Sequence, residues 1–91
     1  MAITAIFEGP EFSQQQYDQT VRGLEAIGLG APNGRRHHQA AGMGVGMYIV
    51  DIWESEELLG AFAEKLIPII IETGGTPPEP RILQLHNTIT T

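Results

Sequence analysis

The hydrophobic pattern divides the chain into four strand-like runs and two helical ones. Residues 2–8, "AITAIFE", are rich in β-favouring types and precede the turn "GPEF", so we predict a strand that ends near Glu8. Residues 35–42, "RRHHQAAG", form a polar strand candidate, and "MGVG" then reverses the chain. Residues 47–53, "MYIVDIW", are the most strand-like run, and residues 81–90, "RILQLHNTIT", form the last predicted strand.

The first helical run begins at a recognisable cap. Ser13 and Gln16 have capping-box spacing, and Phe12 and Tyr17 sit where a hydrophobic staple would place them. We therefore predict a helix that starts at Ser13 and ends at the glycines 28 and 30. Its apolar stripe, spaced at three and four residues, consists of Tyr17, Val21, Leu24 and Ile27.

The second helical run begins at Ser55, which caps a first turn containing Glu56 and Glu57. Pro68 lacks an N–H and does not fit inside a helix, so we expect a kink there or a second short helix starting at it. Gly74 and Gly75 stop the helix. The apolar stripe consists of Leu58, Phe62, Leu66 and either Ile69 or Ile70.

The resulting order is β-α-β-β-α-β, which predicts an α+β, ferredoxin-like fold in a single domain over residues 1–91. Right-handed crossovers place the first and third strands in the middle of a four-stranded antiparallel sheet, with two helices on one face. Both central strands are apolar on both of their faces. Because the helices cover only one face, a second copy packed sheet to sheet is the expected cover, and we predict a homodimer.

Composition removes several classes of function. Eleven acidic and five basic residues give a net charge of −6, which opposes binding to nucleic acid and to anionic membranes. The lack of cysteine excludes disulfides, zinc fingers and thiol nucleophiles. The first residues do not resemble a signal peptide and no run approaches membrane-spanning length, so we expect a cytoplasmic protein.

The segment from Val45 to Pro68 contains "VDIWESEELLGAF" followed by a helix with an internal proline. It resembles the strand-to-helix junction of small antibiotic biosynthesis monooxygenase-like proteins in the dimeric α/β-barrel superfamily, and the element order and size match over nearly the whole chain. The resemblance implies a dimer whose two sheets form a barrel, with a pocket in each subunit between sheet and helices. That superfamily includes cofactor-independent oxygenases and haem-degrading enzymes, so the fold alone does not fix an activity.

Two adjacent histidines lie in the polar strand. Neighbouring residues on a strand point to opposite faces, so His37 and His38 cannot hold one metal ion without a bulge. One of them should face the helix-side cavity. We favour His38, because the register of His38, Gln39 and Ala40 resembles the second strand of the barrel family.

The pairing of the two hairpin strands decides which residues meet. A turn centred on Met43 places His38 opposite Tyr48 and Arg35 opposite Asp51. Asp51 lies within an apolar strand and needs a partner, which Arg35 supplies in this register. A shift of one residue would reverse the faces.

Candidate site residues follow from chemistry. His38 and His86 are the candidate acid/base residues, because imidazole titrates near neutral pH. Trp53, Tyr48 and Phe62 are candidate pocket-lining residues, since aromatic groups tend to wall ligand cavities. Edge positions for the histidines and core positions for the aromatic residues stay open as alternatives. Tyr17 is open to the same cavity-lining interpretation as Tyr48, although the staple also accounts for it in full.

Metal and haem chemistry are not expected. The haem-degrading relatives present an Asn from the first strand and a His from the helix after the Trp-bearing strand, whereas residues 2–8 contain no Asn and residues 58–66 no His. The three histidines also lack the spacing of a zinc site. We therefore expect neither a metal ion nor a cofactor.

Three functions stay open. A cofactor-independent monooxygenase would hold an aromatic or quinol-like substrate against Trp53 and Tyr48, with His38 or His86 taking a proton before the carbanion reacts with oxygen. A non-catalytic protein would bind a small apolar ligand in the same pocket. An assembly module would have its pocket filled by its own side chains, Phe7, Leu24, Phe62 and Leu66.

Overall fold

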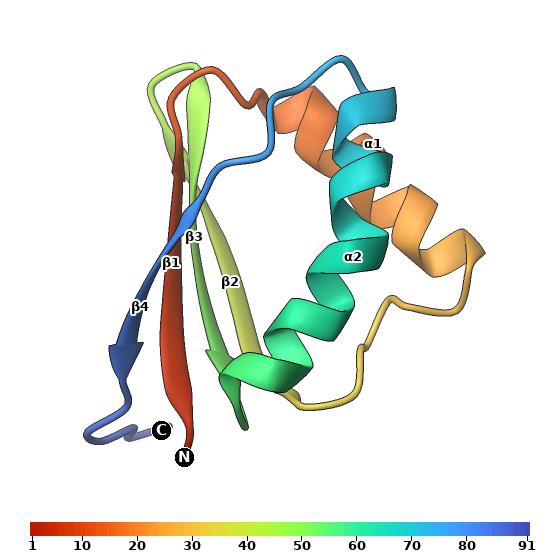
Figure 1. The fold of residues 1–91 in the computed structure, drawn as a ribbon. Helices are drawn as coiled ribbons and strands as arrows, with labels where there is room; N and C mark the ends of the chain where they lie inside the picture. Colours follow the sequence, from red (N-terminus) through yellow and green to blue (C-terminus); the bar gives the residue numbers. More distant parts are fainter.

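Helices and strands follow one another in the predicted order. A computed structural model describes residues 1–91 as β1 (Ile3–Gly9), α1 (Gln14–Ala26), β2 (Arg35–Met43), β3 (Gly46–Trp53), α2 (Glu56–Glu72) and β4 (Pro80–Gln84). The strands form one antiparallel sheet in the order β2-β3-β1-β4, which confirms the α+β, ferredoxin-like βαββαβ fold. Both helices lie on the same face of this sheet (Figure 1).

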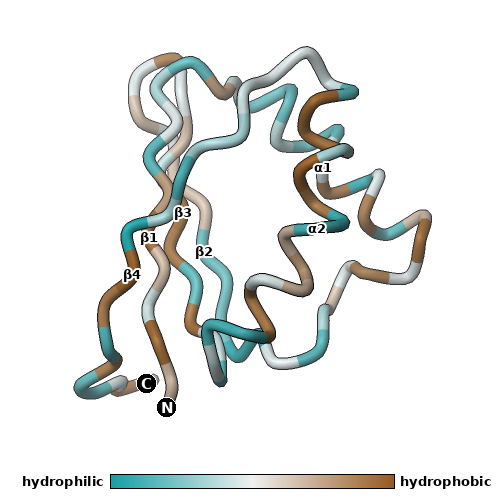
Figure 2. The backbone as a smooth tube through the Cα atoms, viewed as in Figure 1, coloured by the Kyte–Doolittle hydropathy of each residue, from teal (hydrophilic) through white to brown (hydrophobic).

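The core forms between the sheet and the helices. Alternate residues of the two central strands point towards the helices and are buried, and residues of α1 and α2 pack onto them. In Figure 2 hydrophobic segments follow the central strands and α2, whereas the β2 edge carries hydrophilic stretches. The main buried side chains are Ile3, Phe7, Ile49 and Trp53 from the sheet, and Leu24, Leu59, Phe62 and Ile70 from the helices.

The cap signals of both helices are confirmed. Ser13 Oγ accepts from the Gln16 N–H at 3.1 Å, and Gln16 Oε1 accepts from the Ser13 N–H at 3.0 Å. Ser55 Oγ accepts from the Leu58 N–H at the start of α2. Each such cap stabilises a helix by about 1 kcal/mol, and together they fix where the chain leaves the sheet.

The C-terminal half of the chain differs from the prediction in two places. α2 is one helix with Pro68 inside it, so the alternative of a second helix beginning at Pro68 is wrong. Pro68 is exposed and Ile70 is buried, so packing of the last turn offsets the backbone hydrogen bond that proline cannot make. β4 ends at Gln84, short of the predicted strand end. Neither helix has the length and apolar character needed to cross a membrane.

The β2–β3 hairpin has a register that the sequence did not predict. Its turn consists of residues 44 and 45, and Gly44 adopts the positive φ of 61° that a two-residue turn with Gly in the first position needs. Because the turn lies later in the chain than predicted, His38 pairs with Asp51 and not with Tyr48. The candidate site depends on this offset.

The other face of the sheet carries no helix (Figure 1). Ile6, Tyr48, Val50 and Ile52 are only half-buried there, and Leu83 is 51% exposed. Polar residues, among them His37, Gln39 and Arg81, alternate with the helix-facing residues of the two edge strands. This face therefore has an apolar centre and polar edges.

Candidate functional site

A cavity of about 630 Å³ lies between the sheet and the two helices. Its walls are mainly apolar and come from both helices, from the sheet and from the connection before β4. Phe7, Leu24, Phe62 and Leu66, which the assembly alternative would use as filling, instead line the space. An apolar cavity with a few converging polar groups is the usual form of a small-molecule site.

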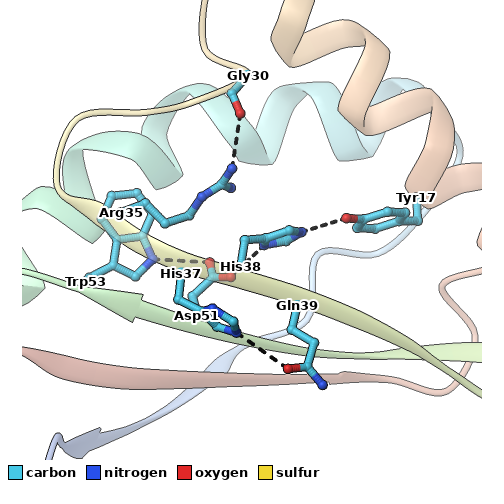
Figure 3. A network of polar contacts seen from close by, with 8 residues as sticks. All are labelled: Tyr17, Gly30, Arg35, His37, His38, Gln39, Asp51 and Trp53. Carbon is cyan, nitrogen blue, oxygen red and sulfur yellow. Dashed lines mark hydrogen bonds and ion pairs between the residues drawn. The ribbon is translucent and has the colours of Figure 1, made fainter. Parts of the chain in front are cut away.

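Three polar side chains form a hydrogen-bonded chain in the cavity wall (Figure 3). His38 Nδ1 lies 2.6 Å from Asp51 Oδ1, and His38 Nε2 lies 2.6 Å from the Tyr17 hydroxyl. Trp53 Nε1 donates to the second carboxylate oxygen of Asp51 at 3.1 Å. The chain thus crosses from β3 through β2 to α1.

Asp51 determines which nitrogen of His38 carries the proton. An ionised carboxylate can only accept hydrogen bonds, so His38 Nδ1 is protonated and donates to it. In the neutral ring Nε2 then has a free lone pair, and the Tyr17 hydroxyl donates to it. Tyr17 Oη keeps its own acceptor capacity for a ligand in the cavity.

The burial of Asp51 explains why this network is complete. Asp51 is only 3% exposed, and a buried carboxylate is costly unless both oxygens have partners. His38 and Trp53 supply those partners. The predicted pair of Arg35 with Asp51 is wrong, because the register places Arg35 opposite Trp53.

Tyr17 is half-buried on the α1 side of the cavity. Burial raises the pKa of its hydroxyl above the ordinary value of 10, while the positive charge of Arg35 opposes the rise and the charges of Asp51 and Asp18 add to it. The hydroxyl is therefore protonated at neutral pH. It can give its proton to His38 readily only when it takes up another one in exchange.

A β-bulge brings Arg35 into the same cavity. The register of β2 shifts between Arg35 and His37, so that Arg35 and His38 both point towards the helices (Figure 3). Arg35 Nη2 donates to the Gly30 carbonyl at 3.1 Å, and its guanidinium carbon lies 5.9 Å from the centre of the Phe62 ring. Bulges often re-aim a side chain in this way beside functional sites.

Two of the predicted site residues line the cavity. His38, with 25% of its side chain exposed, faces the helices, while His37 points to the opposite side of the sheet next to Gln39 (Figure 3). Phe62 forms part of the apolar wall. One histidine therefore faces each way, as the strand geometry predicted.

The other three predicted residues lie elsewhere. Trp53 is fully buried behind Asp51 and packs against Phe62, with ring centres 5.2 Å apart, so it supports the cavity wall instead of forming it. Tyr48 lies on the helix-free face, because the residues of β3 that face the helices are Met47, Ile49, Asp51 and Trp53. His86 is exposed beyond the end of β4. No three His, Asp or Glu side chains are grouped to bind a metal ion.

Sequence reasoning missed the hydrogen bond between Tyr17 and His38 and the pairing of His38 with Asp51. The staple with Phe12 accounts for Tyr17 in the sequence, and nothing there indicates a polar contact across the core. The pairing of His38 with Asp51, in contrast, had a signal in the sequence. A two-residue turn at 44–45, with Gly in the first position, is a common hairpin connection and aligns His38 with Asp51.

Comparison with known proteins adds no family and no relative. A scan against protein-family models finds no match, and a search of curated proteins finds none either. The resemblance to antibiotic biosynthesis monooxygenase-like proteins therefore stays a prediction. The geometry of the cavity and its polar chain carries the functional inference.

Proposed function

We propose that the protein binds an aromatic or quinol-like small molecule in its cavity and oxygenates it without a cofactor. One observation supports this above all: the chain from Asp51 through His38 to Tyr17 ends in the wall of an apolar cavity. An imidazole that is oriented by a buried carboxylate is a standard arrangement for moving protons in enzymes. The apolar wall supplies a space in which a substrate can be oriented.

The first step is removal of a proton from a phenol, quinol or activated CH₂ group. Tyr17 Oη accepts this proton while its own proton passes to His38 Nε2. Asp51 stabilises the imidazolium that forms. The raised pKa of Tyr17 favours this exchange over a permanently ionised tyrosine.

Dioxygen is the oxidant in the second step. The substrate carbanion forms a C–O bond with dioxygen, and the resulting peroxide takes back the proton from His38 through Tyr17. For a CH₂ group, loss of water from the hydroperoxide leaves a ketone, so that R₂CH₂ and O₂ become R₂CO and H₂O. The protein contributes orientation, exclusion of water and one proton relay.

The dimer belongs to the same proposal. A second copy packed against the helix-free face in a C2 arrangement forms the barrel that the resemblance implies. This is supported by the apolar centre of that face, which contains Ile6, Val50 and Ile52 together with the exposed Leu83. Such contiguous apolar patches on small proteins mark interaction sites.

A binding protein without turnover is the second candidate. It is favoured by the fact that both nitrogens of His38 already have protein partners, so the histidine meets a ligand only through Tyr17. The two candidates predict the same ligand class. They differ in whether oxygen is consumed.

Oxygen uptake with a panel of hydroquinones and anthrone distinguishes them. A monooxygenase consumes oxygen, and Tyr17→Phe, which removes the accepting oxygen atom, lowers kcat by about 10²-fold or more. Tyr48→Phe is the matched control, because this second tyrosine lies on the helix-free face. Saturable binding of these compounds without oxygen uptake by the wild type would favour the binding protein and contradict the oxygenase.

A further inference from the structure

Arg35 is the only arginine or lysine in the cavity wall. The ion pairs of the structure join Arg36 to Glu54, His38 to Asp51, and Arg81 to Glu8, so none of them includes Arg35. The half-buried guanidinium of Arg35, whose contact with Gly30 is exposed, therefore has no ion-pair partner in the chain, although Asp51 and Glu79 also belong to the cavity wall.

The contacts of Arg35 hold the guanidinium without neutralising it. One of its five N–H donors bonds to the Gly30 carbonyl, and the Phe62 ring lies beside the group. Asp51 forms no ion pair with Arg35, and its two oxygens accept from His38 and Trp53. The remaining donors of the guanidinium fork have no hydrogen-bond partner in the chain.

The bulge in β2 is what turns this charge inwards. In a regular strand, residues three positions apart point to opposite faces, so Arg35 would lie on the face opposite His38. The bulge places both on the helix side and leaves Arg36 at the surface, 3.8 Å from Glu54. The chain thus has two adjacent arginines with different surroundings, one half-buried in the cavity wall and one on the outer surface.

We propose that the cavity selects small molecules that carry one carboxylate beside an aromatic or aliphatic body. The carboxylate pairs with the Arg35 fork, whose planar geometry matches two oxygens at once, and the apolar body lies along the wall that contains Phe62 and Leu66. The inference rests on the proposed function in that it uses the same cavity. It narrows the substrate class to hydroxy-aromatic or quinol-type acids, but ligand selection by Arg35 does not itself require turnover.

Calorimetric titration with two matched probes tests this. Naphthalene-2-carboxylate and naphthalene-2-carboxamide have nearly the same shape and differ in charge. The wild type should bind the carboxylate about tenfold or more tightly than the amide, because hydrogen bonds between charged groups are among the stronger ones. Arg35→Gln should abolish this preference, and Arg36→Gln, which removes the same charge at the surface, should leave it intact.

Arg35→Lys extends the test to the geometry of the contact. It keeps the charge and loses the fork, so it should keep part of the preference. Circular dichroism and thermal unfolding establish that each variant is folded. Equal affinities in the wild type, no binding of the carboxylate, or a preference that survives Arg35→Gln would overturn the proposal.

The outcome is separable from that of the oxygenase proposal. Tyr17→Phe should keep the carboxylate preference, since Tyr17 is not part of the guanidinium contact. If the wild type binds carboxylate and amide equally but consumes oxygen in a Tyr17-dependent way, only the proposed role of Arg35 is contradicted. If the wild type prefers the carboxylate but consumes no oxygen, only the oxygenase proposal is contradicted.

Discussion

His38 of β2 and Asp51 of β3 lie directly opposite each other, and His38 Nδ1 is 2.6 Å from Asp51 Oδ1. The pair is held from both ends, by the Trp53 N–H behind the carboxylate and by the Tyr17 hydroxyl in front of the imidazole. A cross-strand pair on a rigid sheet holds its side chains in a more precisely defined position than a loop would. The buried carboxylate thereby orients a histidine and, through it, a phenol at the cavity.

Replacing His38 by Gln should lower kcat for oxygen uptake by about 10²-fold or more, because the variant cannot accept the Tyr17 proton as a base. His37→Gln is the matched control, since its ring points to the other face of the sheet (Figure 3). Steady-state oxygen consumption measures both variants. Equal loss of activity in the two would contradict the assignment of His38 to the proton relay.

Replacing Asp51 by Asn should destabilise the fold by about 1–3 kcal/mol, because the new amide group cannot accept from His38 and Trp53 with both of its heavy atoms. Urea unfolding gives the change in the free energy of unfolding. Asp18→Asn on the exposed side of α1 is the control and should have little effect. An Asp51→Asn variant as stable as the wild type would show that the carboxylate contributes nothing there.

Much of the fold follows from local sequence signals. The capping box at Ser13, the cap at Ser55 and the strand-like run 47–53 act over a few residues, so their outcome is readable in the sequence. Their order then leaves few topologies for the sheet. These are the features that the structure confirms.

The site was less predictable because it depends on long-range geometry. The contact of Tyr17 with His38 requires α1 to pack at one particular position over the sheet, and the contact of His38 with Asp51 requires the correct hairpin register. A displaced turn moves the partner of His38 along β3, and an odd displacement also exchanges the two faces. Phe62 was predictable because its place on the helix stripe depends only on local spacing.

The pKa of Tyr17 predicts a dependence of stability on alkaline pH. Burial raises this pKa above its ordinary value of 10, so the folded protein holds the proton more tightly than the unfolded chain. The corresponding stability is fully present below about pH 10 and is lost as the pH rises through the higher folded pKa. Tyr17→Phe should therefore lose less stability than the wild type above about pH 10.

Urea midpoints measured at mildly and strongly alkaline pH test this difference. Tyr48→Phe is the control, because it leaves the Tyr17 hydroxyl in place and should decline as the wild type does. A steeper loss of stability in the wild type than in Tyr17→Phe is the result expected from a raised pKa of Tyr17. A wild-type stability that falls no faster than that of Tyr17→Phe would contradict it.

Replacing Val50 by Lys should convert the proposed dimer into a monomer. Val50 lies at the apolar centre of the helix-free face, opposite Ile6 and Gln39, and a charge buried there without a partner is strongly unfavourable. Gln15→Lys adds the same charge at an exposed position of α1 and should not affect assembly. Sedimentation velocity measures the change in assembly. A wild type that is monomeric at micromolar concentration would contradict the proposed dimer.

The tautomer of His38, read from the ¹⁵N chemical shifts and long-range couplings of its ring at neutral pH, tests the proton relay most directly. The contact with Asp51 predicts a proton on Nδ1, the proposed relay requires an unprotonated Nε2 that accepts from Tyr17, and Asp51→Asn should change this pattern. A ring protonated only at Nε2, or one that exchanges freely between tautomers and is unaffected by Asp51→Asn, would contradict the relay.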